Sequence, residues 1–202
     1  MTNVKAETKI AEEDQLRADL YDFLAALLAR PADAALLKKC AALSGDDGDL
    51  GQAIAALSRV ARAVSARSVE SEFNALFIGL GRGELLPYAS YYLTGFLNEK
   101  PLATLRNDMS AQRITRAENV YEPEDNIASL MEMMAGLITG RFGQPASLEA
   151  QKTFYNKHIG PWADHFYSDL EGAKNSVLYA AVGAVGKAFM EIEREAFRMI
   201  AE

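Results

Sequence analysis

The stretch Pro87-Tyr88-Ala89-Ser90-Tyr91-Tyr92-Leu93 carries more information about this protein than any other part of its sequence. A glycine-punctuated connection, Gly79-Leu80-Gly81-Arg82-Gly83, precedes it, and an acidic phrase, Glu122-Pro123-Glu124-Asp125-Asn126, follows it. Three tyrosine hydroxyls beside such a backbone are costly to bury without hydrogen bonds, whereas a half-solvated groove suits their apolar rings and polar tips. The tyrosines are therefore candidates either for the core or for a peptide-binding groove.

Helical periodicity surrounds this stretch on both sides. Apolar residues recur at i, i+4, i+7 and i+8 spacings, which are typical of one buried helix face. Proline and glycine interrupt the pattern, for example at Arg30-Pro31, Gly140 and Pro161. We expect helices through residues 16–28, 36–43, 54–77, 102–109, 122–138, 147–158 and 177–200.

Three connections separate these helices. Residues 44–49 are polar and rich in turn-forming residues, so they are the clearest loop. Residues 79–87 lack the glycine spacing of a dinucleotide loop and the Gly-Lys-Ser/Thr ending of a phosphate loop, which leaves a flexible interhelical connection. Residues 113–121 are a looser stretch that we interpret as a hinge.

The fold class follows from this pattern. No run of alternating residues predicts a strand, and a chain of 202 residues, 50% of them hydrophobic, is long enough for one sizeable core. We predict an all-α fold, a single globular multi-helix bundle of about eight to ten helices over residues 14–202. Residues 1–13 mix lysine with glutamate and lack an apolar segment, so we expect a flexible N-terminal tail and no secretory signal.

Composition argues against several classes of protein. Charged residues make up 24% of the chain, and no stretch approaches the roughly 20 apolar residues that span a bilayer, so we expect no stable membrane insertion. The net charge of −7, without a cluster of lysine and arginine, argues against nucleic-acid binding. The single cysteine, Cys40, rules out an internal disulfide, fits a reducing compartment such as the cytoplasm and is predicted to lie in the core.

Candidate catalytic residues are few. His158 and His165 belong to no metal-ligating pattern, and no nucleophile elbow or Cys/His arrangement is present. The carboxylates of Glu122, Glu124 and Asp125 stand at the predicted start of a helix, beside a proline whose φ suits the first turn, where capping explains them better than acid/base catalysis. We therefore expect no enzyme, no metal site and no cofactor.

A family resemblance rests on three separated motifs in the first two thirds of the chain: Phe73, Leu76-Phe77, Gly79 and Gly81; Pro87–Leu93; and Glu122–Asn126. In this order they resemble the signature of TorD/DmsD-type chaperones, the redox enzyme maturation proteins. The resemblance implies an all-helical cytoplasmic protein that assists molybdenum-containing redox enzymes and binds their twin-arginine leader peptides. The predicted partner is thus a protein.

The resemblance also implies a site. The peptide-binding residues would be Pro87, Tyr88, Ser90, Tyr92, Glu122, Glu124, Asp125 and Asn126. Tyr88 and Tyr92 would take the apolar part of a leader, and Asp125, with Glu122 or Glu124, would face its guanidinium groups. Asn126 stands where the family usually has histidine, so hydrogen bonding can persist there without titration.

A further part of the resemblance lies in the C-terminal half, at His158, Pro161-Trp162, Phe166 and Asp169-Leu170. His158 and Trp162 lie four residues apart, and we favour packing or a hydrogen bond over function as their explanation.

Apolar residues on either side of the acidic phrase have structural interpretations as well. Phe73 and Leu76-Phe77 are predicted core because they recur at helical spacing. Met131 and Met133-Met134 are either adaptable core, which we favour, or the floor of an apolar groove.

The function predicted from this resemblance is binding of the twin-arginine leader and the immature form of a molybdoenzyme, which supports cofactor insertion and delays export. The phrase at residues 99–103 and the methionine-rich helix are most similar to members associated with formate dehydrogenases, with dimethyl-sulfoxide or trimethylamine-oxide reductase as the other clients. Two alternatives stay open, a helical nucleotide-binding enzyme and an assembly scaffold that ignores leaders. Whether two copies of the chain form a homodimer is also open.

Overall fold

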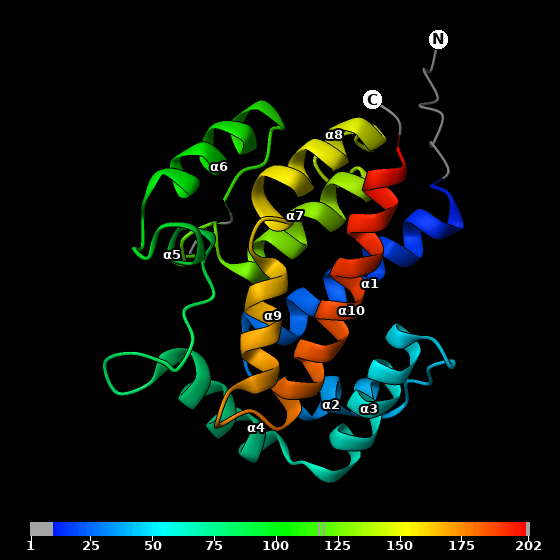
Figure 1. Ribbon diagram of the computed structural model, residues 1–202, viewed down its shortest axis with the longest axis vertical. Coiled ribbons are helices and arrows are strands. Elements are labelled where there is room, and N and C mark those ends of the chain that lie inside the picture. The colour runs from blue at the N-terminus through cyan, green and yellow to red at the C-terminus, as the bar shows by residue number, and fades with distance from the viewer. Residues whose placement is uncertain (1–9, 117, 119, 201–202) are drawn as a thin grey trace.

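The computed structural model describes residues 10–116, 118 and 120–200, and these fold into ten α-helices and two π-helical turns (Figure 1). In chain order they are α1 (Glu12–Ala29), α2 (Ala34–Ala41), α3 (Asp49–Ala63), α4 (Ala66–Phe73), η1 (Asn74–Ile78), α5 (Ala89–Thr94), α6 (Lys100–Ala111), α7 (Ile127–Thr139), α8 (Leu148–Phe154), η2 (Tyr155–Ile159), α9 (Ala163–Gly172) and α10 (Leu178–Met199). The described residues contain no strand, which confirms the all-α prediction.

Three helix pairs dominate the packing. α1 lies against α7, and α10 lies between α9 and α3 (Figure 1). The core joins these layers through large side chains such as Tyr21, Leu24, Leu130 and Phe189, each at most 2% exposed. The π-helical turns extend α4 and α8, so each of those helices continues for one wider turn before the chain changes direction.

The helix boundaries differ from the predicted ones where capping groups intervene. The helix predicted over 54–77 begins at Asp49 and breaks after Ala63, because the Ser65 and Ser68 side chains form a capping box that starts α4. The helix predicted from Glu122 begins only at Ile127, since the Asn126 side chain accepts the Ala128 N–H and caps it.

Other differences are smaller. The helix predicted to include Leu43 ends at Ala41. The stretch after Pro87 contains the short helix α5, and α9 follows Pro161; neither was predicted from periodicity. Residues 1–9 of the predicted tail lie outside the described residues, while α1 includes the last two residues of that tail.

Several predicted core residues are buried. Cys40 is fully buried, and this burial raises the pKa of its thiol to about 11. Met131, Met133 and Met134 all belong to the core, although Met133 also lines a small cavity. Among the helices described, none combines the length and the hydropathy that crossing a membrane requires.

Candidate peptide-binding groove

Two of the three motifs that carry the family resemblance, Pro87–Leu93 and Glu122–Asn126, meet in space. An isolated antiparallel bridge joins Tyr88 to Asn126. The Ala89 N–H donates to the Asp125 carbonyl at 3.0 Å, and the Ile127 N–H donates to the Pro87 carbonyl at 2.9 Å. This bridge aligns the starts of α5 and α7, so residues that are more than 30 positions apart in sequence form one site.

Asp125 and Ser90 hold this junction from inside. Asp125 is 1% exposed, and its Oδ2 accepts the Ser90 N–H at 2.8 Å, which caps the start of α5. Ser90 is fully buried as well. The predicted contact between Asp125 and a leader guanidinium therefore meets a physical obstacle, because the carboxylate already serves a backbone N–H and has almost no accessible surface. Its place indicates a positioning role.

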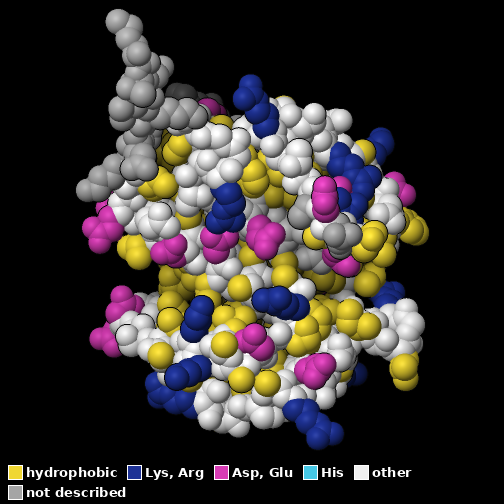
Figure 2. All heavy atoms as spheres, turned by 180° about the vertical axis from the view of Figure 1, so that it is seen from behind, with side chains coloured by type: hydrophobic (Ala, Val, Ile, Leu, Met, Phe, Trp, Pro, Cys, Tyr) yellow, Lys and Arg dark blue, Asp and Glu magenta, His cyan; other side chains and the backbone are white. Residues whose placement is uncertain are grey.

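A cavity of about 330 Å³ opens beside this junction. Four predicted site residues line it: Pro87, Tyr88, Glu122 and Asn126. The remaining walls come from the ends of α1, α4 and η1, from the segment before α7 and from α7 itself, and they include Leu28, Phe73, Phe77, Ile78, Val120, Ser129 and Glu132. Figure 2 shows the face opposite α9 and α10, where hydrophobic side chains form a hollowed band between an upper and a lower half of the molecule. An apolar segment with polar anchors is the kind of ligand that such a groove suits.

Glu122 places a carboxylate at this cavity. It accepts a hydrogen bond from the Tyr88 hydroxyl, and no lysine or arginine of the described residues forms an ion pair with it. Partial removal from water raises the pKa of Glu122 above its ordinary value. Arg116 donates to the Glu122 backbone carbonyl at 2.5 Å and not to the carboxylate, so the carboxylate stays open to a cationic ligand.

Glu124 has a different environment. Arg106 donates two hydrogen bonds to its Oε2, at 3.0 and 2.8 Å, and Arg116 lies 3.7 Å from the other oxygen. Burial alone would raise the pKa of Glu124, but hydrogen bonding and the charges of both arginines lower it below the ordinary value. Glu124 is therefore already paired with two guanidinium groups of the chain itself.

Tyr92 lies outside the Tyr88 cavity. Its ring packs against Trp162 and Phe166, with centroids 5.2 and 6.0 Å away, and its hydroxyl donates to Asp169 Oδ2 at 2.9 Å. Burial, followed by the hydrogen bond to Asp169, raises the pKa of Tyr92. The structure thus joins Tyr92 to the C-terminal motif, and the predicted single groove with both tyrosines is divided into two places.

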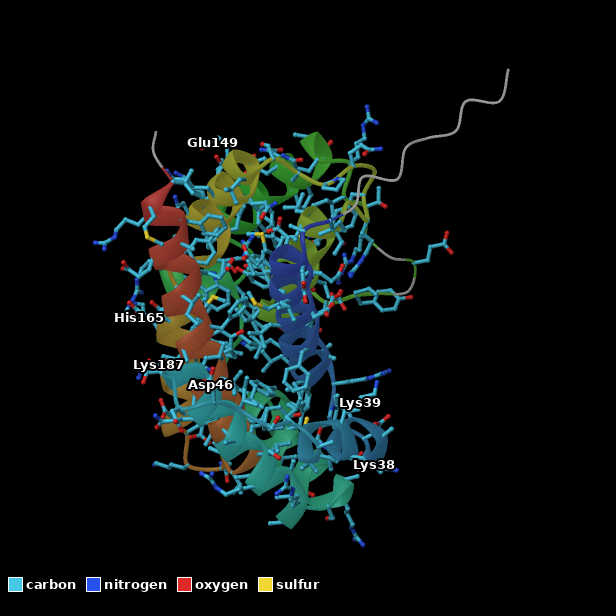
Figure 3. The ribbon with its side chains drawn as sticks, turned by 90° about the vertical axis from the view of Figure 1, so that its right-hand side faces the viewer. Lys38, Lys39, Asp46, Glu149, His165 and Lys187 are labelled. Atoms are coloured by element: carbon cyan, nitrogen blue, oxygen red, sulfur yellow. The ribbon has the colours of Figure 1, made fainter. Side chains whose placement is uncertain are left out.

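The two histidines do not converge. His158 is 5% exposed, its Nε2 lies 2.7 Å from Asp108 Oδ2, and its carbonyl accepts the Trp162 indole N–H at 2.8 Å. Burial lowers the pKa of His158, while Asp108 opposes this effect. His165 lies on the outer side of α9 (Figure 3). Within the described part of the chain no group of three or more metal-ligating side chains occurs.

Sequence reasoning missed Glu132 as a site residue. It lies on α7 and lines both the cavity beside Tyr88 and a neighbouring cavity of about 180 Å³. Its position in a run of methionines and leucines offered one signal, because a charged residue inside an apolar helix segment marks the solvent-facing side of that helix.

The chain is similar in sequence to known chaperones. Residues 43–168 match the family described as nitrate reductase delta subunit. The chain is 25% identical over 201 residues to the chaperone protein TorD of Aliivibrio fischeri, which covers 89% of this chain and 94% of the relative. It is 28% identical over 149 residues to TorD of Vibrio cholerae serotype O1, covering 70% of this chain and 68% of the relative.

A solved structure shares the fold. The crystal structure of a chain described as a redox enzyme maturation protein from Archaeoglobus fulgidus superimposes with a TM-score of 0.55 at 17% identity, and it covers 94% of this chain and 99% of that chain. The curated relatives are named as chaperones, which confirms the expectation that the protein is not an enzyme. Because the matched region includes more than half of its 202 residues, this chain belongs to the nitrate reductase delta subunit family, the family of the TorD chaperones.

Proposed function

We propose that this protein is a cytoplasmic TorD-type chaperone that binds the twin-arginine leader and the immature form of a molybdoenzyme. A twin-arginine leader consists of two arginines followed by an apolar stretch. The groove beside Tyr88 offers both complements, an apolar wall from α1 and η1 and a partly desolvated carboxylate at Glu122. This pairing of an apolar wall with a carboxylate that lacks a cation among the described residues is the observation that supports the proposal most strongly.

The residues of the groove have different roles in this proposal. Glu122 receives a guanidinium group, because carboxylates accept arginine in a fork geometry. Pro87, Phe77 and the ring of Tyr88 contact the apolar stretch. Asp125 and Ser90 act behind the surface, where they keep the two backbone segments in register. Glu124 contributes little to the leader because Arg106 and Arg116 already neutralise it.

Delay of export follows from occupancy of the leader, since a bound leader is not accessible to the export machinery. The clients we propose are formate dehydrogenases or the reductases of dimethyl sulfoxide and trimethylamine oxide. A second surface of the chaperone would hold the immature enzyme while its molybdenum cofactor is inserted. Pull-down of a client with and without its leader separates leader-dependent binding from a scaffold that recognises only the enzyme body.

Calorimetry with a synthetic leader tests the groove. We expect Glu122→Gln to weaken leader binding by about 1.5–3 kcal/mol, the cost of losing a hydrogen bond to a charged group. Glu149→Gln removes the same charge from α8 (Figure 3). Glu149 lines neither the cavity beside Tyr88 nor its neighbour, so this variant should bind the leader with unchanged affinity. A leader with both arginines replaced by glutamine should bind weakly to every variant. Equal affinity of the two leaders for the unaltered protein would overturn the proposal.

A further inference from the structure

A second carboxylate, that of Glu132 on α7, lines the same groove as Glu122. Glu132 lies on the solvent-facing side of that helix and lines both the 330 Å³ cavity and the adjoining 180 Å³ cavity. Glu122 also lines both cavities. The two carboxylates are therefore neighbours across one continuous depression, and Ser129 and Val120 form part of the wall that both cavities share.

The chain carries a cation close to Glu132 but directs it elsewhere. Arg141 follows the C-terminus of α7, where Gly140 adopts a left-handed conformation with φ of 77° and the Arg141 N–H donates to the Gly136 carbonyl at 2.9 Å. Its guanidinium forms a two-pronged ion pair with Asp22 of α1, with contacts of 3.2 and 2.5 Å. Arg141 lines the smaller cavity together with Glu132.

This arrangement leaves Glu132 without an ion pair among the described residues. Desolvation raises the pKa of Glu132, the charge of Asp22 raises it further, and Arg141 only partly opposes the two effects. A carboxylate so placed is stabilised by any guanidinium that enters the groove, since a fork-shaped contact restores the interactions lost with water. Arg141 would supply such a group if Asp22 did not hold it.

We propose that Glu132 is a second guanidinium-binding position of the groove, and that Asp22 keeps it open by holding Arg141 away from it. The inference rests on the proposed function, because the occupant to which it commits is a twin-arginine leader. Glu122 and Glu132 then receive one arginine each, which explains why the groove has two carboxylates on one apolar depression. Asp22 is a positioning residue, since it acts on the leader through Arg141.

A set of variants tests this assignment by calorimetry with the synthetic leader. We expect Glu132→Gln to weaken binding by about tenfold, equivalent to about 1.4 kcal/mol. Asp22→Asn should weaken binding to a similar degree, because the released Arg141 pairs with Glu132. Arg141→Gln alone should preserve or increase affinity, and the double variant Asp22→Asn with Arg141→Gln should restore it. Glu149→Gln serves as the charge control.

The outcomes distinguish this inference from the function on which it rests. The second guanidinium-binding position is wrong if Glu132→Gln binds the leader with unchanged affinity. It is also wrong if Asp22→Asn loses as much affinity in combination with Arg141→Gln as it does alone. Neither result contradicts binding of the leader at Glu122. A leader that fails to bind the unaltered protein overturns the proposed function itself. Melting temperatures of all variants are compared first, and single-arginine leaders provide a second readout. If Glu132 receives one of the two arginines, loss of that arginine should cost the Glu132→Gln variant less than it costs the unaltered protein, whereas loss of the other arginine should cost both proteins the same.

Discussion

Two regions of this protein place carboxylates in opposite environments, one with an ion pair and one without any among the described residues. Glu193 of α10 is fully buried, and it receives Arg17 of α1 through two contacts of 2.7 and 2.8 Å and the Tyr21 hydroxyl at 2.9 Å. Glu122 and Glu132 lie in the groove without an ion pair from the described residues. In the first region the chain supplies its own guanidinium; in the second no described residue pairs with either carboxylate, which is where we propose that a ligand guanidinium binds.

The difference lies in whether a carboxylate pairs with an arginine of the chain itself. Burial lowers the pKa of Arg17, but its hydrogen bond to Glu193 and the charge of Glu193 raise it more, so Arg17 stays charged. Such a pair ties α1 to α10 and leaves no capacity for a partner. The groove carboxylates keep that capacity, because both are exposed and neither forms an ion pair with a described residue.

The largest expected effect is on stability and comes from removing the ion pair between Arg17 and Glu193. Arg17→Met should lower the free energy of unfolding by about 3 kcal/mol or more, because it leaves the Glu193 carboxylate buried without its partner. Urea denaturation measures this loss, and Arg198→Met, which removes a 75% exposed side chain, is the matched control. Leader affinity of the folded variant should not change. A loss below about 1 kcal/mol would show that the interior pair does not carry the stability assigned to it.

The next effect separates the two tyrosines. Tyr92→Ala should cost about 2–3 kcal/mol of stability, less than a fully buried aromatic residue, because the ring of Tyr92 packs on Trp162 and Phe166. Tyr88→Ala should have the opposite profile, with a small loss of stability and a loss of about 1–2 kcal/mol in leader binding. Denaturation and calorimetry on the same two variants decide the matter. If Tyr92→Ala binds the leader poorly while it stays stable, the groove extends to α5.

Asp125→Ala tests the positioning role. We expect a loss of about 1–2 kcal/mol in stability, the cost typical of losing a helix cap, because the Ser90 N–H loses its acceptor. Asp125→Asn keeps an acceptor oxygen and should recover most of this loss. The ratio of affinities for leaders with and without arginine should persist in both variants. Loss of that ratio in Asp125→Asn would instead place the charge of Asp125 in contact with the leader.

Acidification should weaken leader binding by about 1 kcal/mol per pH unit once the groove carboxylates take up protons. The pKa values of Glu122 and Glu132 lie above the ordinary 4.5, so the loss begins at a higher pH than for an ordinary glutamate. Because folding raises these pKa values, their ionisation costs stability as pH rises, and the leader offsets that cost. Calorimetry as a function of pH should show the dependence in the unaltered protein, and replacing both residues with glutamine should remove it.

Salt should have the smallest effect. The guanidinium contacts of the groove are partly exposed, so raising the ionic strength should weaken leader binding by less than about 1 kcal/mol. The stability contributed by the buried Arg17 and Glu193 should respond less. Titrations in low and high salt check this for affinity, and urea denaturation under the same conditions checks it for stability. Complete independence of salt would mean that the apolar stretch carries the binding.

Sequence patterns located most helices because apolar spacing is a local property. The stripe of α7 and the long α10 were predicted close to their observed positions, and Gly140 ends α7 as expected. Boundaries were missed where one side chain decided them, as at Ser65, which starts α4. The acidic phrase was predicted as the start of a helix, yet Asn126 alone caps α7, because a cap depends on one side-chain hydrogen bond and not on net charge.

The sequence by itself determined the all-α class, the family and the two phrases that the structure pairs, since these depend on periodicity and on short motifs. Only the tertiary structure decided what each carboxylate does. Asp125 is buried beneath the bridge, Glu124 is paired with two arginines, and Glu122 and Glu132 face the groove. The physical reason is that the energy of a charge depends on its water and its nearest counter-charge, and both come from residues far away in the chain.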